Sequence, residues 1–245
     1  MNLGPDAWRE ALGLRQDETP VAVILEGTWW EREAYAARSA KLADVRELAF
    51  PGWMLGRHRG LPLVYACAYG APKAVEPVHV LAQVGTRLAI QIGSCGGLHP
   101  DLATGDLVVP SRAEIGEGAS PAYGTSDVSL ASRPWVERAT AAAHARGVRV
   151  HDGHHLTTSA LLQQPPETVA RWHAAGYTSV DMETSAVYSV AAAFGIDAVA
   201  LLFVWDELLA GRGFLADFDD DETARQRRAN EITFDVALEL VEMVA

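Results

Sequence analysis

Cysteine and basic residues are scarce in this chain of 245 residues. The two cysteines, Cys67 and Cys95, form no recognisable disulfide framework or zinc-binding spacing. The 20 Lys and Arg are outnumbered by 32 Asp and Glu, which gives a formal net charge of -12. Nucleic-acid backbones and anionic membranes bind to clustered cations, so neither is expected as a partner. A small anionic ligand stays possible, because a pocket can be locally positive on an acidic protein.

Long apolar runs are also missing. No stretch approaches the roughly 20 apolar residues that span a bilayer, and residues 1–14 lack the basic start and apolar run of a signal peptide. We therefore expect a cytoplasmic protein. Hydrophobic residues make up 49% and charged residues 21% of the chain, as in ordinary globular proteins. The length fits one domain, residues 1–245.

Short apolar runs alternate with segments of helical periodicity. The runs are rich in Val, Ile, Leu and Ala, as in strands buried on both faces. We predict an α/β fold of a single domain, with a central mixed β-sheet flanked by helices. The predicted strands are residues 21–25, 63–68, 88–92, 106–109, 148–150 and 198–204. The predicted helices are residues 31–41, 74–84, 134–146, 166–174, 184–194 and 221–243.

Ligands of such sheets bind beyond the carboxyl ends of the strands. One exit, Gly93-Ser94-Cys95-Gly96-Gly97, permits close backbone approach to a ligand, although a simple tight turn explains the glycines equally well. Asp181-Met182-Glu183 precedes a predicted helix, where acidic residues are common for local reasons. Asp206 follows a buried strand, and burial beside Trp205 would raise its pKa toward the range of a general acid. The Gly- and Asp-rich residues 211–221 are expected to form a mobile flap.

Taken in order, these segments resemble the nucleoside phosphorylase and nucleosidase superfamily, which includes the purine nucleoside and uridine phosphorylases. The matching segments are a strand ending at Gly27, Tyr69-Gly70-Ala71-Pro72, residues 91–97, Gly105-Asp106-Leu107-Val108, Glu117-Gly118-Ala119-Ser120 with Tyr123, Asp181-Met182-Glu183 and Val204-Trp205-Asp206. Each segment is weak evidence alone, whereas the ordered set is specific.

The resemblance implies a role for each matching residue. Glu183 would bind the ribose hydroxyls, Met182 would pack on the sugar, and Asp206 would protonate the departing purine. Gly27, Ser94 and, with one inserted residue, Arg32 would hold phosphate. Arg228 or Arg227 would assist Asp206, with Arg228 assigned to the catalytic set, and Leu162 would lie against the base. No cofactor is implied beyond phosphate as co-substrate, and a homo-oligomer built from dimers, including a hexamer, is expected.

Three features depart from the family pattern. Gln91 stands where phosphorylases carry a phosphate-binding arginine, although we keep it in the predicted substrate site. Trp205 replaces a small residue and would narrow the base pocket. The arginine that a neighbouring subunit supplies to phosphate has only weak candidates, Arg46 and Arg57.

The departures leave three functions open. Phosphorolysis of a nucleoside, with a purine preferred, is the leading prediction. Hydrolysis by a water molecule is the alternative, with Glu31 or Glu33 as the activating base, although a solvated helix face explains these two residues better. A nucleoside-binding protein that retains the fold without turnover is the third. His154 and His155 point to opposite faces of a strand, so we predict no metal site there.

Overall fold

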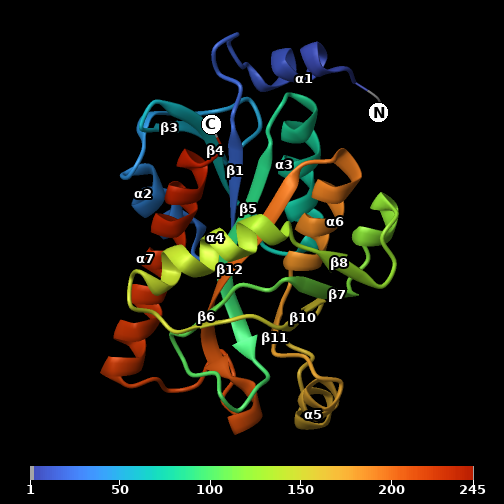
Figure 1. The fold of residues 1–245 in the computed structure, drawn as a ribbon, viewed down its shortest axis with the longest axis vertical. Helices are drawn as coiled ribbons and strands as arrows, with labels where there is room; N and C mark the ends of the chain where they lie inside the picture. Colours follow the sequence, from blue (N-terminus) through green and yellow to red (C-terminus); the bar gives the residue numbers. More distant parts are fainter. Residues whose placement is uncertain (1–2, 245) are drawn as a thin grey trace.

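A mixed β-sheet of twelve strands runs through the centre of the computed structural model, which describes residues 3–244 (Figure 1). Its longest path has the order β2-β3-β4-β1-β5-β11-β10-β7-β8, and β12 pairs with β5 and β6, while β9 pairs with β6. The strands are β1 (Ala22–Gly27), β2 (Ala43–Glu47), β3 (Trp53–His58), β4 (Leu61–Cys67), β5 (Leu88–Gly97), β6 (Leu107–Val108), β7 (Arg112–Gly116), β8 (Val128–Leu130), β9 (Val150–His151), β10 (His154–Thr158), β11 (Ser179–Asp181) and β12 (Asp197–Glu207).

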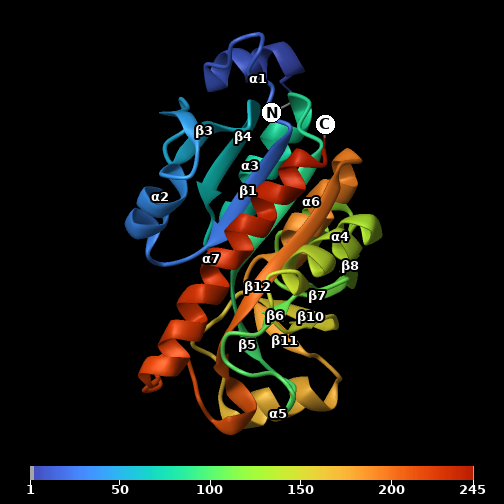
Figure 2. The ribbon, with the colours of Figure 1, turned by 60° about the vertical axis from the view of Figure 1, so that its left-hand side comes forward.

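Helices cover both faces of the sheet. Long helix α7 crosses one face, with α4 beside it, and α3 and α6 pack together on the other face (Figures 1 and 2). The α-helices are α1 (Pro5–Leu12), α2 (Glu31–Ser39), α3 (Ala71–Gln83), α4 (Arg133–His144), α5 (Pro166–Ala174), α6 (Thr184–Phe194) and α7 (Asp220–Glu242), and the 3-10 turns are η1 (Ser120–Tyr123) and η2 (Leu208–Ala210). None of the helices within residues 3–244 combines the length and hydropathy that a membrane crossing requires.

Alternating residues of β1 build two separate cores. Ala22 and Ile24 join the cluster that includes Phe234 of α7, whereas Val23 and Leu25 join the cluster that includes Val187 of α6. All four β1 residues are essentially inaccessible to solvent. A strand buried on both faces packs apolar side chains at successive positions, which is why residues 22–25 form a continuous apolar run.

The predicted α/β fold with a mixed sheet is confirmed. The six predicted helices and six predicted strands are present, α5 and α6 with the predicted ends and the others with shifted ends. The sequence reading missed α1 and the strands β2, β3, β7 and β8. It placed β10 only as a strand that holds His154 and His155, and β11 only as a strand ending near Met182. Edge strand β2 has no fully buried residue, so its sequence lacks an apolar pattern. Helix α7 begins as predicted on the acidic run, where Asp219 and Glu222 form a capping box.

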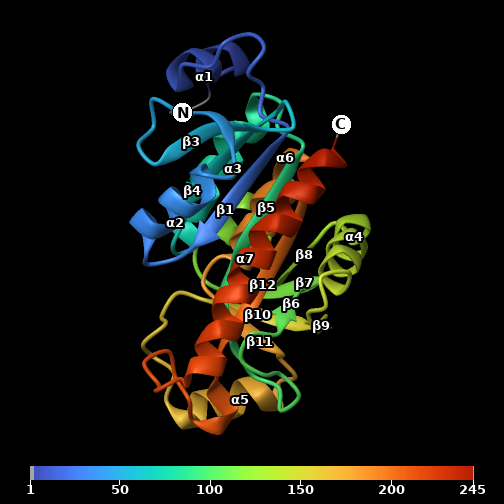
Figure 3. The same ribbon diagram turned by 90° about the vertical axis from the view of Figure 1, so that its left-hand side faces the viewer.

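The central strands β4, β1, β5 and β12 are parallel, and their carboxyl ends meet at one edge of the sheet. In Figure 3 this edge faces the end of the molecule that carries α5, opposite α1. Irregular segments follow each strand there, because a parallel strand must leave the sheet before its crossover helix. The edge is therefore where a ligand site is expected.

Candidate active site

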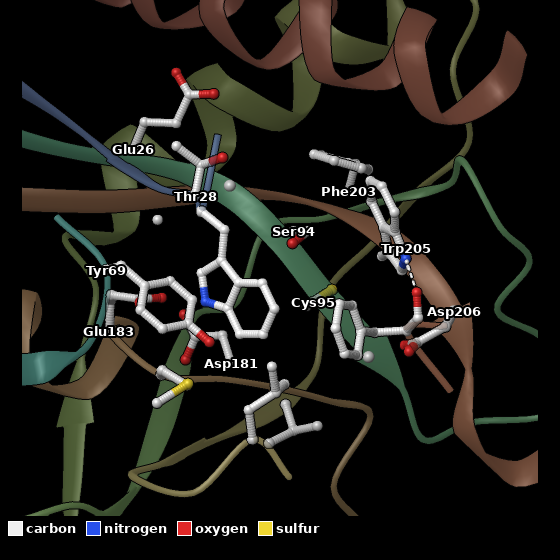
Figure 4. A pocket seen from close by; sticks show the side chains of 18 of the residues that line it. Glu26, Thr28, Tyr69, Ser94, Cys95, Asp181, Glu183, Phe203, Trp205 and Asp206 are labelled. Atoms are coloured by element: carbon white, nitrogen blue, oxygen red, sulfur yellow. Dashed lines mark hydrogen bonds between the residues drawn. The ribbon is translucent and has the colours of Figure 1, made fainter. Parts of the chain in front are cut away.

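A pocket lies where β1, β5, β11 and β12 end (Figure 4). Its floor is formed by Gly27, Gly93 and Ser94, and carboxyl groups from Glu183 and Asp206 enter from opposite sides. Gly93 has a φ of +155°, and a Cβ there would lie 3.0 Å from the Gly27 carbonyl oxygen. The glycines thus let β1 and β5 approach each other closely beneath the pocket.

Glu183 is held at the turn between β11 and α6. Its side chain is 4% exposed, and Oε1 accepts a hydrogen bond from the Gly70 amide at 2.5 Å. A Cβ on Gly27 would lie 2.8 Å from Glu183 Oε2, so a larger residue there would have to displace the carboxyl from this position. Burial, with the neighbouring charge of Asp181, raises the pKa of Glu183 to about 8.

A buried hydrogen-bond network fixes that turn from behind. Asp181 accepts hydrogen bonds from Gln91 Nε2 at 2.8 Å, from Thr157 Oγ1 at 2.9 Å and from the Thr184 amide at 3.0 Å. The His155 ring lies 2.8 Å from Asp181 Oδ1. Burial alone would raise the pKa of Asp181, but His155 and these donors hold it below its ordinary value. A charged Asp181 therefore anchors the residues on either side of Glu183.

Asp206 owes its position to a bulge in β12. Val204 pairs with Cys95 and Asp206 with Gly96, so Trp205 is the extra residue between two consecutive pairs. The Asp206 side chain is 5% exposed, and a Cβ on Gly96 would lie 3.1 Å from its Oδ1. Burial raises the pKa of Asp206 to about 7, and the nearby Glu207 carboxylate acts in the same direction. This is the range in which a carboxyl can donate a proton near neutrality.

Aromatic rings from two loops cover the pocket. Trp30 stacks on Trp205 with ring centroids 5.5 Å apart, and Trp29 meets Phe214 edge-on at 4.9 Å. Trp29 also contacts Tyr69 at 5.6 Å. Phe214 belongs to the segment predicted as a flap, and its carbonyl accepts a hydrogen bond from Trp205 Nε1 at 3.1 Å (Figure 4). The cover thus joins the loop after β1 to the loop after β12.

A buried ion pair closes the pocket beside β1. Glu26 is 3% exposed, and its carboxylate accepts hydrogen bonds from Arg38 at 2.9 and 3.0 Å and from Tyr65 at 2.7 Å. Arg38 also donates to Asn230 Oδ1 at 2.7 Å. Glu26 and Asn230 line the pocket, whereas Arg38 lies behind them. The guanidinium charge is therefore matched before any ligand binds.

The lining of the pocket is acidic and aromatic. Carboxylates of Glu26, Asp181, Glu183 and Asp206 reach it, and within residues 3–244 no Lys, Arg or His side chain does. The positive charge of Arg212 acts to lower the pKa of Asp206, but Arg212 is paired with Glu222 at 2.6 Å and with Glu207 at 3.3 Å. A phosphate group here would rely on backbone amides and hydroxyl groups.

Five of the predicted site residues meet in this pocket: Gly27, Ser94, Met182, Glu183 and Asp206. Their roles remain predictions, but the positions required for those roles are present together. They lie on four separate segments, which the parallel strands β1, β5 and β12 and the turn after β11 bring to one edge of the sheet.

Four predicted site residues lie elsewhere. Arg32 is exposed on the first turn of α2, and Arg228 is exposed on α7, where it donates to the Arg146 carbonyl at 3.2 Å. Gln91 is 1% exposed and points to Asp181 and Thr184, because its strand position faces α6. Leu162 is 74% exposed, and its neighbour Leu161 lines the pocket instead.

The alternative candidates are also displaced. Arg227 is exposed on α7, Glu33 is exposed on α2, and Glu31 forms an ion pair with Lys73 outside this pocket. The two weak candidates for binding phosphate also form ion pairs elsewhere. Arg46 pairs with Glu18, and Arg57 pairs with Asp17 and Asp44. Helical periodicity did not reveal which face of α2 or α7 meets the pocket.

Several pocket residues were missed by the sequence reading. Glu26 carried a signal, because it is the one charged residue in the buried strand β1. Trp29, Trp30 and Phe214 lie in loops, whose sequences have no periodicity to predict their direction. His154 contacts Glu114 at 3.2 Å and His155 contacts Asp181, so the two histidines point apart as predicted.

Comparison with known proteins places this geometry in a family. The family model described as the phosphorylase superfamily matches residues 54–242. The chain therefore belongs to the phosphorylase superfamily. A purine nucleoside phosphorylase, DeoD-type, of Caldanaerobacter subterraneus subsp. tengcongensis is 30% identical over 171 residues, which are 69% of this chain and 72% of the relative. A guanosine phosphorylase of Halorubrum lacusprofundi is 31% identical over 155 residues, 62% of this chain and 64% of the relative.

A solved structure supports the fold independently. Uridine phosphorylase from Vibrio fischeri ES114 superposes with a TM-score of 0.79 over 91% of this chain and 92% of its own, at 20% sequence identity. At that identity the likeness concerns the fold alone. The overall fold of this chain is thus similar to that of a solved phosphorylase structure.

Proposed function

We propose that the protein cleaves the N-glycosidic bond of a nucleoside, with phosphate as co-substrate, and releases a free base and ribose 1-phosphate. The observation that carries the proposal is the pairing of Glu183 and Asp206, two buried carboxyls with raised pKa values, across one pocket. The relatives named as purine nucleoside and guanosine phosphorylases favour a purine base.

The site residues fit the charges of this reaction. Positive charge develops on the sugar as the glycosidic bond breaks. Glu183 would hold the sugar through hydrogen bonds with the ribose hydroxyls, and it would stabilise the developing charge in its ionised form, above a pKa of about 8. Asp206, protonated below a pKa of about 7, would donate its proton to the leaving purine. Met182 would pack on the sugar, and the Gly27 backbone and Ser94 hydroxyl would hold phosphate without a cofactor.

Hydrolysis is the second candidate, and one observation favours it. Glu26 lines the pocket beside Gly27, and none of the Lys, Arg or His side chains within residues 3–244 lines it. A phosphate dianion here would meet no unpaired cation, because Arg38 is already paired with Glu26, whereas a water molecule needs none. If water is the acceptor, Glu26 replaces Glu31 and Glu33 as the residue positioned to accept its proton.

One assay separates these functions. Purine and pyrimidine nucleosides are incubated with and without phosphate, and ribose and ribose 1-phosphate are quantified. We expect ribose 1-phosphate and strict dependence on phosphate. Full-rate release of ribose without phosphate would establish hydrolysis, and binding without any cleavage would leave only the binding-protein alternative. Light scattering on the same preparation tests the predicted homo-oligomer.

A further inference from the structure

His155 is a fully buried, ionisable residue behind the pocket, and the proposed mechanism gives it no role. It stands on β10 and does not line the pocket, whereas Asp181, which it contacts, does. Each ring nitrogen faces an oxygen: Nδ1 lies 2.8 Å from Ser179 Oγ, and Nε2 lies 2.8 Å from Asp181 Oδ1. Both nitrogens of a charged imidazole are donors. The contacts therefore fit a ring that is protonated at both nitrogens.

The other ionisable groups around this contact are acidic or neutral. The turn after β11 carries Glu183, β5 carries Cys95, and α6 carries Tyr188. Burial raises the pKa of Cys95 and of Tyr188, and the charge of Asp181 acts in the same direction, so both groups stay neutral. Among the described residues that contact Asp181, His155 alone can carry a positive charge.

The charged residues of the neighbouring strand β7 face the other way. The parallel register places Arg112 beside His154 and not beside His155. Adjacent residues of paired strands share a face of the sheet, and successive residues alternate between faces. Glu114 contacts His154 at 3.2 Å, and Glu117, beyond β7, is held by hydroxyl groups of η1 and α6. No cation of β7 therefore shares the charge of His155.

Asp181 connects this contact to Glu183 through the backbone of the turn. The Thr184 amide donates to Asp181 Oδ2 at 3.0 Å. The Ser185 amide donates to Thr157 Oγ1 at 2.8 Å, and that hydroxyl donates to Asp181 Oδ1 at 2.9 Å. The Asp181 carboxylate thus holds the first turn of α6, and Glu183 lies between the two ends of this bonded segment. Both carboxyl groups line the pocket (Figure 4).

We propose that His155 is a positioning residue for Glu183: its charged ring neutralises the carboxylate of Asp181, and Asp181 fixes the turn that carries Glu183. The inference rests on the proposed function only where it assigns the sugar to Glu183. No proton or other group is transferred in this role. Two buried carboxyls without a cation do not both ionise readily, so the charge of His155 also makes Glu183 easier to ionise.

The first test observes the His155 ring in the unmodified protein, so it does not depend on the folding of a variant. We expect the nitrogen chemical shifts of this ring in ¹⁵N NMR at pH 7 to be those of an imidazole that carries protons on both nitrogens. A ring with one bare nitrogen under these conditions overturns the proposal.

The second test follows the ionisation of Glu183 by carboxyl ¹³C NMR, with Glu183→Gln to identify the signal. His155→Gln, which is polar but uncharged, should raise the titration midpoint by about one pH unit, and Asp181→Asn should lower it by about one. In the Asp181→Asn background, His155→Gln should add no rise, because no charge remains to be neutralised. His154→Gln, on the opposite face, is the matched control. An unchanged midpoint in His155→Gln contradicts the inference.

Turnover measures the effect of the position of Glu183. On inosine, His155→Gln should lower kcat/KM about tenfold or more, because the carboxyl that would hold the sugar is displaced, while His154→Gln should keep full activity. A lower Tm of His155→Gln without a change in the Glu183 titration indicates a merely structural role and overturns the inference. If the unmodified protein cleaves no nucleoside but both NMR results hold, the proposed function fails and the link from His155 to Glu183 stands.

Discussion

Glu183 and Asp206 are buried to a similar degree and have similarly raised pKa values, but the structure holds them in different ways. Around Glu183 the surroundings are polar and connected, from the Gly70 amide to Asp181, His155 and Gln91. Around Asp206 they are aromatic, and the position depends on one strand bulge and two loops. One carboxyl is therefore fixed by a hydrogen-bond network and the other by packing, so they should respond differently to substitution.

The largest expected effect is a loss of kcat when the acidic proton of Asp206 is removed by substitution. In Asp206→Asn the buried amide occupies the same volume but cannot act as an acid, so kcat on a neutral purine nucleoside should fall about 10²–10⁴-fold. Thermal unfolding should stay the same or shift upward. The matched control is Asp197→Asn at the exposed start of the same strand, which should keep full activity. An active Asp206→Asn enzyme would remove Asp206 from the mechanism.

Two glycines test the two sides separately. A Cβ on Gly27 would strike the Glu183 carboxyl at 2.8 Å, and one on Gly96 would strike Leu208 at 2.6 Å and Asp206 at 3.1 Å. Gly27→Ala should raise the KM for ribonucleosides about tenfold or more, the cost of hydrogen bonds to a displaced carboxylate. Gly96→Ala should lower kcat instead. Steady-state kinetics distinguish the two, with Gly118→Ala, which has open space around it, as the control.

The polar network behind Glu183 gives a smaller effect on stability. Gln91→Leu removes one donor from Asp181 and one acceptor from Thr184, which should cost about 1–3 kcal/mol in the free energy of unfolding. Because Gln91 does not reach the pocket, the KM for phosphate should not change. Denaturant titration and phosphate kinetics measure the two quantities. A large rise in the KM for phosphate would restore the predicted contact between Gln91 and phosphate.

The smallest effect concerns pH. The folded-state pKa of Glu183 is about 8 against an ordinary 4.5, so the stability this group contributes is complete below pH 4.5 and is lost as pH rises through 8. Glu183→Gln removes that loss, so its Tm above pH 8 should exceed that of the unmodified protein by about 5 °C while activity falls. Calorimetry over this range, with Glu10→Gln on α1 as control, provides the measurement. Identical pH profiles for Glu183→Gln and the unmodified protein would contradict the buried-charge account.

The sequence alone determined the fold class and the segments that meet at the site. Buried strands are continuously apolar, and the residues that bind a ligand follow their carboxyl ends. Gly27, residues 93–97, Glu183 and Asp206 could therefore be identified from the sequence as candidate site residues. Their ordered spacing also identified the superfamily, as residues 54–242 bear out. The start of α7 was predicted near residue 221, one residue from its observed start at Asp220, because acidic residues favour a helix N-terminus through a local interaction.

Only the tertiary structure decided which side chains face one another. Gln91 was assigned to phosphate by its place in a motif, yet its strand position directs it to Asp181. Arg32 and Arg228 were chosen as cations near the correct elements, but helix rotation turns them to the surface, while Glu26 and Arg38 form the buried pair. The Trp30–Trp205 contact joins residues 175 positions apart. Such contacts depend on loop paths and on one bulge, which no local pattern of residues encodes.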